Sequence, residues 1–324
     1  MRFVVFGAGA IGGVVGARLA QAGDEVVLVA RGAHADALAE RGLRLRAPDG
    51  DVTVELPVAG SAGDLELRDE DVVLLATKSQ DTAAALLDLA AVAPATIAIV
   101  CVQNGVANER AASRLFASVY GVCVMVPAEH LEPGVVVAQS APVTGLLDVG
   151  RFPRGADGIA EEIAGAFRRG TFEAEVRDDV MAWKYRKLVL NLANAVEATC
   201  ARGTGRQELI DLLRREGEEV LRVAGIAIVS AEDDERRRGD LLRVHEVGGR
   251  PRAGSSTWQS LARRTGTVET DYLNGEIVLL GRLHGVPTPA NELLQRTVRE
   301  LAAARGAPGS LSAATLIAQL RARS

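Results

Sequence analysis

Apolar residues in the first half of the chain form short continuous runs that alternate with helically spaced patterns. The continuous runs predict buried strands at Arg2–Phe6, Glu25–Ala30, Asp71–Ala76 and Thr96–Val102. The helical spacing predicts helices at Ile11–Gln21 and Thr82–Ala91. Strands that are apolar on both faces and alternate with helices are typical of a parallel sheet with helices on both sides. We therefore expect an α/β domain at the start of the chain.

The pattern changes between Val119 and Val149, where apolar runs lie between turn residues. Two of these runs, Gly134–Gln139 and Thr144–Val149, predict an antiparallel extension of the sheet. A helix at Asp157–Arg168 and a last strand at Phe172–Val176 are predicted to complete this part of the chain.

After Asp178 the apolar pattern is helical only, and we expect no further strands. The helices are expected at Asp179–Thr199, Arg206–Ala224, Ala231–Val247, Ser255–Arg264, Glu269–His284, Pro289–Ala304 and Ser312–Arg323. The loop Gly248–Gly254 predicts a break between two of them, and the mixed charges of Glu232–Arg238 predict a solvated helix face. The expected fold is α/β: an N-terminal Rossmann-type parallel-sheet domain over residues 1–178 and an all-helical C-terminal domain over residues 179–324.

The composition narrows the class of protein. The chain has 324 residues, 48% of them apolar and 24% charged, which allows two sizeable cores and excludes a disordered, collagen-like or disulfide-rich chain. The net charge of -5 argues against a general nucleic-acid binder. Cys101, Cys123 and Cys200 match no metal-ligand spacing, so we expect buried thiols in a reducing cytosol and no metal site.

The apolar stretch Phe3–Ala17 is too short to span a bilayer, and Arg18 ends it. Its glycines lie at spaced positions that a signal peptide does not need. We therefore expect a cytoplasmic protein that is neither exported nor bound to a membrane.

The spaced glycines form a G-x-G-x-x-G motif between the first predicted strand and the first predicted helix. The motif consists of Gly7, Ala8, Gly9, Ala10, Ile11 and Gly12. In such a motif the first glycine makes a tight turn, the second lets the backbone approach a pyrophosphate, and the third lets helix and strand pack closely. Free amides at the start of the helix then face the phosphates. The sequence therefore predicts a dinucleotide site.

The residue at the end of the second predicted strand indicates which dinucleotide binds. An NAD site usually has Asp or Glu there, on the ribose 2′-hydroxyl. This chain has Arg31, and the carboxylates of Asp36 and Glu40 come too late. A guanidinium can hold a 2′-phosphate through two parallel hydrogen bonds. Arg31 therefore favours NADP, and the other interpretation is a solvated loop arginine.

Lys78 and Asn104 follow the third and fourth predicted strands. The carboxyl ends of parallel strands line the ligand crevice of such a sheet, so both side chains are expected to face cofactor or substrate. The simpler interpretations are a surface lysine at Lys78 and an ordinary turn at Asn104 and Gly105.

A polar face interrupts an otherwise apolar helix of the predicted second domain. Lys187, Asn191 and Asn194 are spaced i, i+4 and i+7, so they share one helical face. Buried polar side chains need partners, which either a polar ligand or a structural network would supply. Glu269 begins a later apolar helix, where a carboxylate has either a catalytic use or only a stabilising one at the helix N-terminus.

Together these features resemble the ketopantoate reductase (2-dehydropantoate 2-reductase) family over nearly the whole chain. The resemblance rests on Gly7–Gly12, Arg31, Lys78, Gln103–Gly105, Trp183–Asn194, Ser255 with Ser256, and Glu269–Gly275. It implies NADPH-dependent reduction of a 2-oxo acid, most directly 2-dehydropantoate to pantoate, by a Rossmann domain joined to a helical domain. The implied partner is therefore a small-molecule 2-oxo acid, and the apolar helical domain is compatible with a homodimer.

The resemblance also implies roles for individual residues. Lys187 is the expected general acid, which donates the proton while NADPH supplies the hydride, and Glu269 acts beside it. The expected contacts to cofactor or substrate come from Asn104, Asn191 and Ser256, and Asn194 is a further substrate-binding candidate on the Lys187 face.

The segment before Glu269 departs from the family pattern. Ala253 stands where the family usually has Asn, Thr257–Ser260 replaces its usual Met and Gln-Asp, and one residue is inserted. The identity of the 2-oxo acid therefore stays open. The alternatives are a relative that acts on a different oxo or hydroxy acid and an NADP-binding sensor without turnover.

Overall fold

The computed structural model describes residues 1–249, 252–264 and 266–322. Over these residues the chain forms two compact units. The first comprises Met1–Trp183 and Ala231–Arg252, and the second comprises Lys184–Ser230 and Ala253–Ser324. A segment from the later half of the sequence therefore belongs to the first unit. The functional division at residue 178 stays a prediction.

All the strands in the described residues belong to the first unit. They are β1 (Arg2–Phe6), β2 (Glu25–Val29), β3 (Leu43–Ala47), β4 (Gly50–Val54), β5 (Val58–Ala59), β6 (Val72–Leu75), β7 (Ala98–Cys101), β8 (Ser118–Met125), β9 (Ala128–Glu132), β10 (Val135–Ala138), β11 (Ser140–Pro142), β12 (Gly145–Arg151), β13 (Phe172–Glu173) and β14 (Leu242–Val244). The helices of this unit are α1 (Ala10–Gln21), α2 (Gly32–Arg41), α3 (Thr82–Ala90), α4 (Asn108–Ala112), α5 (Gly158–Arg169) and α9 (Ala231–Arg238), with the 3₁₀ helices η1 (Ala62–Asp64) and η2 (Ser79–Asp81).

The second unit is helical, as predicted. It begins within α6 (Val180–Asn191) and continues with α7 (Ala193–Thr199), α8 (Arg206–Val223), α10 (Ser256–Ala262), η3 (Glu269–Tyr272), α11 (Asn274–His284), α12 (Pro289–Ala303) and α13 (Ala313–Arg321). Two predicted helices are divided: Asp179–Thr199 breaks at Leu192, and Glu269–His284 begins as η3. The last residue of the predicted helix Ser312–Arg323 lies outside the described residues.

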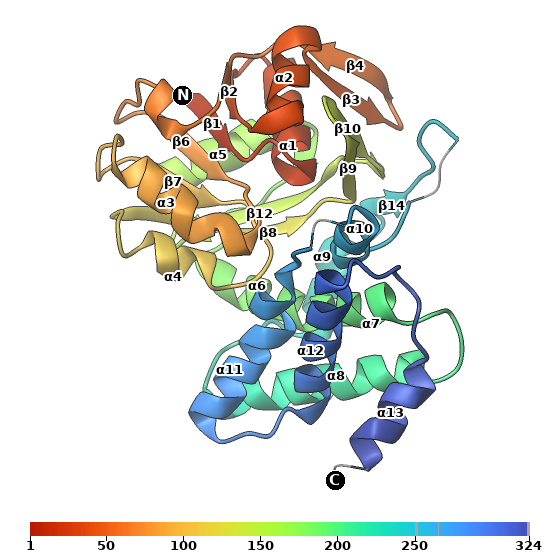
Figure 1. Ribbon diagram of the computed structural model, residues 1–324. Helices are drawn as coiled ribbons and strands as arrows, with labels where there is room; N and C mark the ends of the chain where they lie inside the picture. The colour runs from red at the N-terminus through yellow and green to blue at the C-terminus, as the bar shows by residue number, and fades with distance from the viewer. Residues whose placement is uncertain (250–251, 265, 323–324) are drawn as a thin grey trace. The chain divides into compact units, whose positions relative to one another are not determined.

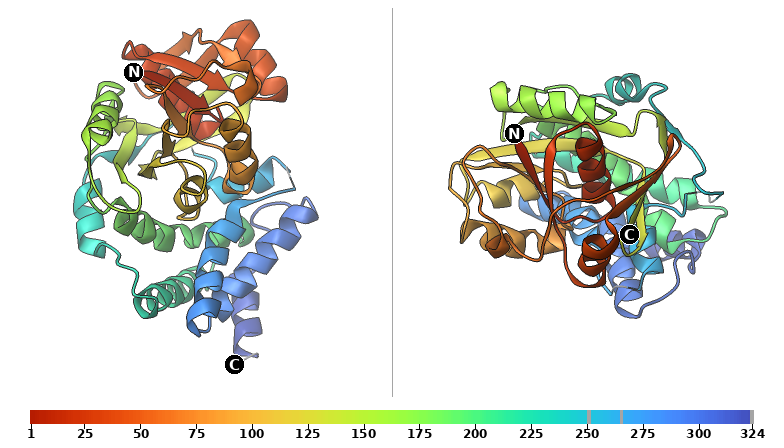
Figure 2. Two further views of the ribbon diagram at one scale, coloured as in Figure 1. Left: turned by 90° about the vertical axis from the view of Figure 1, so that its left-hand side faces the viewer. Right: turned by 90° about the horizontal axis from the view of Figure 1, so that it is seen from above.

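The main sheet has the strand order β13-β12-β8-β7-β6-β1-β2-β5 (Figures 1 and 2). Neighbouring strands from β5 to β8 pair in parallel, and β12 pairs antiparallel with β8. The predicted parallel sheet and its antiparallel extension at Thr144–Val149 are confirmed. The order reverses between β1 and β6, and ligands of such sheets bind outside the carboxyl ends of the strands at this point.

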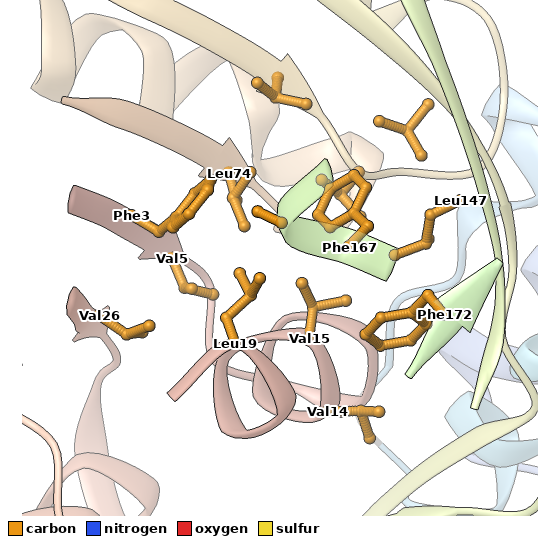
Figure 3. Packing of buried hydrophobic residues seen from close by; sticks show 14 of the residues in the cluster. Phe3, Val5, Val14, Val15, Leu19, Val26, Leu74, Leu147, Phe167 and Phe172 are labelled. Atoms are coloured by element: carbon orange, nitrogen blue, oxygen red, sulfur yellow. The ribbon is translucent and has the colours of Figure 1, made fainter. Parts of the chain in front are cut away.

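Side chains of β1 alternate between two cores on opposite faces of the main sheet. Phe3 and Val5 lie in one core with residues of α1 and α5 (Figure 3). Val4 and Phe6 lie in the other core with residues of α3. Burial on both faces explains why this strand is continuously apolar.

A second sheet, of order β4-β3-β10-β9, lies outside the sequence prediction. The predicted run Gly134–Gln139 contains β10, which pairs antiparallel with β9 but parallel with β3. It therefore extends a different sheet from the expected one. In β3, Arg44 and Arg46 alternate with buried residues, so a search for continuous apolar runs does not find this half-buried strand.

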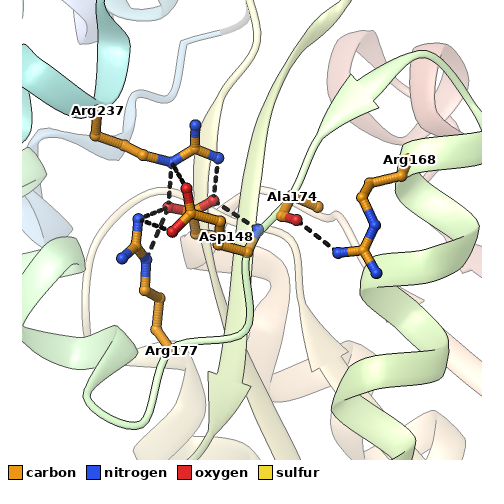
Figure 4. A network of polar contacts seen from close by, with 6 residues as sticks. Asp148, Arg168, Ala174, Arg177 and Arg237 are labelled. Atoms are coloured by element: carbon orange, nitrogen blue, oxygen red, sulfur yellow. Dashed lines mark hydrogen bonds and ion pairs between the residues drawn. The ribbon is translucent and has the colours of Figure 1, made fainter.

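The prediction of helices alone after Asp178 is wrong for Ala231–Val247. Only its first half is helical, as α9, and β14 pairs antiparallel with β11. The predicted solvated face on α9 is also wrong in part. Asp234 is 1% exposed, and Arg237 donates to Asp148 of β12 through Nη2 at 2.7 Å and Nε at 3.0 Å (Figure 4). Mixed charges usually face solvent, but here an ion pair buries one of the arginines. Part of the predicted break after this segment, at residues 250 and 251, lies outside the described residues.

Candidate functional site

The predicted dinucleotide loop follows β1, beside the point where the strand order reverses. Gly7 has a φ of +105°, and a Cβ there would lie 2.9 Å from the Thr77 nitrogen. A Cβ on Gly12 would lie 2.9 Å from Val5 Cγ1, whereas a Cβ on Gly9 would meet nothing within 4 Å. Packing therefore requires the first and third glycines, and the second borders open space.

Backbone amides around the start of α1 divide into two groups. Gly7 and Ala8 both donate to the Val29 carbonyl, at 3.0 and 3.2 Å, and Gly9 is the N-cap residue of α1. The amides of the first helical turn have no backbone acceptor within the helix; they belong to Ala10, Ile11 and Gly12. Open space and amides of this kind fit the pyrophosphate of a dinucleotide.

Arg31 is the N-cap residue of α2, just after β2. Its side chain is 70% exposed, and its Nη2 lies 3.5 Å from Asp88 Oδ2 on α3. Asp88 also accepts a hydrogen bond from the Ala62 amide at 3.3 Å. An exposed ion pair of this length contributes little free energy, so the guanidinium can exchange Asp88 for a phosphate. Asp88 was not among the residues predicted for the site.

Lys78 and Asn104 follow the neighbouring strands β6 and β7, and a buried polar network joins their loops. Asn108 Nδ2 donates to the Asn104 carbonyl at 3.0 Å. Thr82 Oγ1 donates to Asn108 Oδ1 at 2.9 Å and accepts from Gln103 Nε2 at 2.8 Å. Sequence reasoning gave Thr82 and Asn108 no role. Thr82 is a polar residue at the start of a predicted apolar helix, which is a weak signal, whereas Asn108 lies on α4, where no helix was predicted.

The predicted polar face of the second unit extends over two helices. Lys187 and Asn191 lie on α6, and Asn194 lies on α7, beyond the break at Leu192. All three polar side chains are half-buried. The Leu192 amide still donates to the Leu188 carbonyl, at 3.2 Å, so one helical hydrogen bond extends past the end of α6.

Glu269 opens η3 and is 6% exposed. The next residue, Thr270, donates through Oγ1 to Asn274 Oδ1 at 3.5 Å, and Asn274 Nδ2 donates to the Leu192 carbonyl at 3.4 Å. One asparagine thus bonds both the turn that carries Glu269 and the junction between the two helices of the Lys187 face. Asn274 lies within the segment that carries the family resemblance, but no role was predicted for it.

Asn274 belongs to a larger buried network. Its Nδ2 donates to Asn291 Oδ1 at 3.0 Å, and Asn291 Nδ2 donates to Glu216 Oε2 at 2.8 Å. Burial raises the pKa of Glu216, and hydrogen bonds from the Ala290 and Asn291 amides oppose part of this shift. The network fixes α8 and α12 to the asparagine that bonds the site elements.

Ser256 begins α10, which packs against α7. Its neighbour Ser255 caps this helix by accepting a hydrogen bond from the Trp258 amide at 3.4 Å. A Cβ on Gly254 would lie 2.9 Å from Trp258 Cγ, so the tryptophan ring covers this part of the loop. At the end of α10, burial lowers the pKa of Arg263, and the charge of Glu269 partly opposes the shift. Glu269 therefore has a nearby arginine that was not predicted for the site.

The candidates form two groups, one in each unit. The first unit holds the glycine loop, Arg31, Lys78 and Asn104. The second holds Lys187, Asn191, Asn194, Ser256 and Glu269. Within the described residues there is no cluster of His, Cys, Asp and Glu side chains suited to a metal ion, and no helix is long and apolar enough to cross a bilayer. Cys101, Cys123 and Cys200 are buried thiols, as predicted.

Comparisons with known proteins cover most of the chain. The 2-dehydropantoate 2-reductase of Pyrococcus horikoshii is 29% identical over 301 residues, which cover 92% of this chain and 97% of that protein. The enzyme of the same name from Caulobacter vibrioides is 31% identical over 305 residues, covering 90% and 95%. A crystal structure of a PanE/ApbA family ketopantoate reductase from Ralstonia eutropha JMP134 is 30% identical, has a TM-score of 0.79 and covers 94% of this chain and 99% of that one.

A D-mandelate dehydrogenase, solved with NADH and anilino(oxo)acetate, shares the fold with a TM-score of 0.80 at 21% identity, over 94% of this chain and 99% of that one. The sequence profile of ketopantoate reductase PanE/ApbA matches residues 3–153, and that of the ketopantoate reductase C-terminal region matches residues 179–302. The chain therefore belongs to the ketopantoate reductase family, whose members are oxidoreductases that act on CH–OH groups of small molecules.

Proposed function

We propose that the chain reduces a 2-oxo acid, 2-dehydropantoate, to its 2-hydroxy acid with NADPH. The bonding of Asn274 to both Leu192 and Thr270 carries this proposal. Through these two hydrogen bonds Asn274 connects the helical segment that carries the half-buried Lys187 to the turn that begins with the buried Glu269. Carbonyl reduction needs a proton donor and a group that keeps the donor charged, and these two residues supply both.

The first unit would hold the dinucleotide. The amides and open space of the glycine loop suit its pyrophosphate, and Arg31 suits a ribose 2′-phosphate. Lys78 and Asn104, in loops joined by the Asn108 network, suit the rest of the crevice. When bound, the cofactor supplies hydride, and the protein supplies orientation and charge.

Lys187 is the proposed general acid. Negative charge develops on the carbonyl oxygen of a ketone as it is reduced, and an ammonium Nζ can both stabilise that charge and donate the proton. Glu269 would hold the ammonium form and accept a hydrogen bond from a substrate hydroxyl. The remaining polar groups that suit the substrate are Asn104, Asn191, Asn194 and Ser256.

The activity is tested by following NADPH absorbance with a panel of 2-oxo acids that includes 2-dehydropantoate. We expect turnover of 2-dehydropantoate with kcat/KM on the order of 10⁴ M⁻¹s⁻¹ or more. NADPH binding without turnover of any 2-oxo acid would contradict the reductase proposal and favour a dinucleotide-binding sensor.

A different 2-oxo acid is the second candidate substrate, and the segment before Glu269 favours it. Ala253 cannot form the side-chain hydrogen bonds of the family's usual asparagine, and Trp258 covers Gly254. If the missing amide weakens 2-dehydropantoate binding, Ala253→Asn should lower its KM several-fold. An unchanged KM, with another 2-oxo acid preferred in the panel, would assign the chain to that acid instead.

A further inference from the structure

One imidazole ring joins three distant segments of the first unit. His34 lies on α2, three residues after Arg31, and its Nε2 lies 2.7 Å from the Ala8 carbonyl oxygen in the glycine loop. The Gly134 amide, between β9 and β10, donates to Nδ1 of the same ring at 2.9 Å. The ring of His130, on β9, lies against it, with centroids 4.2 Å apart.

The two partners determine where the proton sits on His34. A backbone amide only donates, so Nδ1 must accept from Gly134 and carry no hydrogen. A carbonyl only accepts, so Nε2 must carry the hydrogen and donate it to Ala8. These contacts require a neutral ring in the Nε2–H form.

The Gly134 side of this contact is held in place independently of the ring. Gly134 has a φ of +78°, and a Cβ there would lie 3.1 Å from Ala37 Cβ on α2. Its carbonyl accepts from the Arg44 amide of β3 at 2.9 Å. The Gly134 amide, next to the second sheet, therefore holds the His34 ring in place, and the ring's Nε2–H points at the glycine loop.

The hydrogen bond from His34 to the Ala8 carbonyl fixes the orientation of the peptide that joins Ala8 to Gly9. In a trans peptide the C=O and the following N–H point in opposite directions. Holding the Ala8 carbonyl toward His34 therefore turns the Gly9 N–H away from it. The Ala8 amide is held as well, by the Val29 carbonyl. Because Gly9 has no Cβ to resist rotation, the Ala8–Gly9 peptide would flip easily without such a bond.

We propose that His34 is a positioning residue for the dinucleotide: its Nε2–H holds the Ala8–Gly9 peptide so that the Gly9 amide is presented to the pyrophosphate. This inference rests on the proposed binding of NADPH at the glycine loop. It adds a residue outside the motif to the machinery of that loop.

Two substitutions separate the two sides of the ring. The amide nitrogen of Gln reaches the position of Nε2, so His34→Gln keeps a donor for Ala8. The amide oxygen of Asn lies near the position of Nδ1, so His34→Asn keeps an acceptor for Gly134 but has no donor that reaches Ala8. A purely structural role would not rank the two variants in this order for ligand binding.

The test is the dissociation constant of NADPH for the full chain and both variants, with urea denaturation to verify folding. We expect His34→Gln to bind within about 3-fold of the unsubstituted chain and His34→Asn to bind about 10-fold more weakly, the effect of one hydrogen bond. The matched ligand is 2′-AMP, which has the ribose 2′-phosphate but no pyrophosphate. Its affinity should be the same for all three proteins.

Nitrogen NMR of the free chain gives a readout that needs no cofactor. It should show His34 with an unprotonated Nδ1 and a protonated Nε2. The opposite tautomer, or equal NADPH affinity for the two variants, would overturn the role of His34 while leaving the proposed function intact. An unsubstituted chain that binds neither NADPH nor NADH would overturn the proposed function and this inference together.

Discussion

The Arg31 guanidinium is exposed to solvent at the end of β2, and its Nη2 lies 3.5 Å from Oδ2 of its ion-pair partner Asp88. If it holds the 2′-phosphate, Arg31→Ala should weaken NADPH binding about 10-fold, because one charge-assisted interaction is lost. NADH lacks that phosphate, so its affinity should change little. Titrating both dinucleotides into both proteins checks this, and equal loss for both would contradict the assignment.

Asp88 competes with a phosphate for the same guanidinium. Asp88→Asn should therefore raise the affinity for NADPH about 2- to 3-fold, which is the scale of an exposed ion pair. The gain should shrink at high salt, because added ions screen exposed charges. Unchanged NADPH affinity at low salt would mean that Asp88 does not influence the site.

Site residues that belong to a sequence motif could be predicted, whereas the residues that hold them in place could not. The glycine loop was predictable because the spacing of the motif indicates where a tight turn and close packing leave no room for a side chain, at Gly7 and Gly12. Thr82, Asn108 and Asn274 were given no role. Thr82 bonds Asn108, and Asn274 bonds Leu192 and Asn291; these partners lie 17 to 82 residues apart in the sequence, and only the fold brings them together.

At the scale of elements, α5 shows how one carboxylate fixes a helix start. Asp157 caps this helix by accepting from the Ala160 amide at 2.9 Å, and it also accepts from Tyr120 and Arg151 at 2.8 Å each. Burial alone would raise the pKa of Asp157, but these hydrogen bonds outweigh it and lower the pKa overall. The ionised form is therefore more favoured in the folded chain than in the unfolded one.

A lowered pKa adds stability that is present above the unfolded value, near pH 4, and is lost as pH falls through the folded value. Asp157→Asn should reduce the free energy of unfolding by about 1–2 kcal/mol at pH 7, and the difference should shrink below about pH 4. Urea denaturation across pH measures this. Glu161→Gln, which removes an exposed charge from the same helix, is the control and should change stability by less than about 0.5 kcal/mol. A pH-independent difference for Asp157→Asn would contradict the account.

Long apolar elements were predictable, whereas half-buried strands and helix breaks were not. The parallel strands have continuous apolar runs because both of their faces are covered. The break at Leu192 has no sequence signal, since no glycine or proline marks it. It coincides with a carbonyl that accepts from Asn274.

At the scale of the whole molecule, the chain returns to its first unit after entering the second. The returning segment is held by Arg237, whose guanidinium shares the buried Asp148 with Arg177. Arg237→Ala should lower the free energy of unfolding by about 1–3 kcal/mol, because a buried carboxylate loses one of its partners. Amide hydrogen exchange in α9 and β14 should accelerate.

The neighbouring Arg236 provides a matched control. It pairs with Asp233 and Glu232 of its own helix, and its side chain is 65% exposed. Arg236→Ala should leave exchange in β14 unchanged and alter stability by less than about 0.5 kcal/mol. Equal effects of the two substitutions would show that the Asp148 pair does not hold the segment.

This return was not predictable from the sequence, because a helix of mixed charges is normally solvated. The family resemblance, by contrast, extended over both units and was confirmed by the comparisons. The homodimer and the cytoplasmic location stay predictions.

The role of Lys187 is the central claim, and single-turnover reduction of 2-dehydropantoate with bound NADPH tests it most directly. Lys187→Ala should slow this step by about 10²- to 10⁴-fold, the usual contribution of a positioned proton donor. Its NADPH affinity and its unfolding midpoint should stay close to those of the unsubstituted chain. A folded Lys187→Ala protein that binds NADPH and reduces the substrate at an undiminished rate would contradict the account, and the proton would then have to come from another donor, such as Lys78 or a bound water.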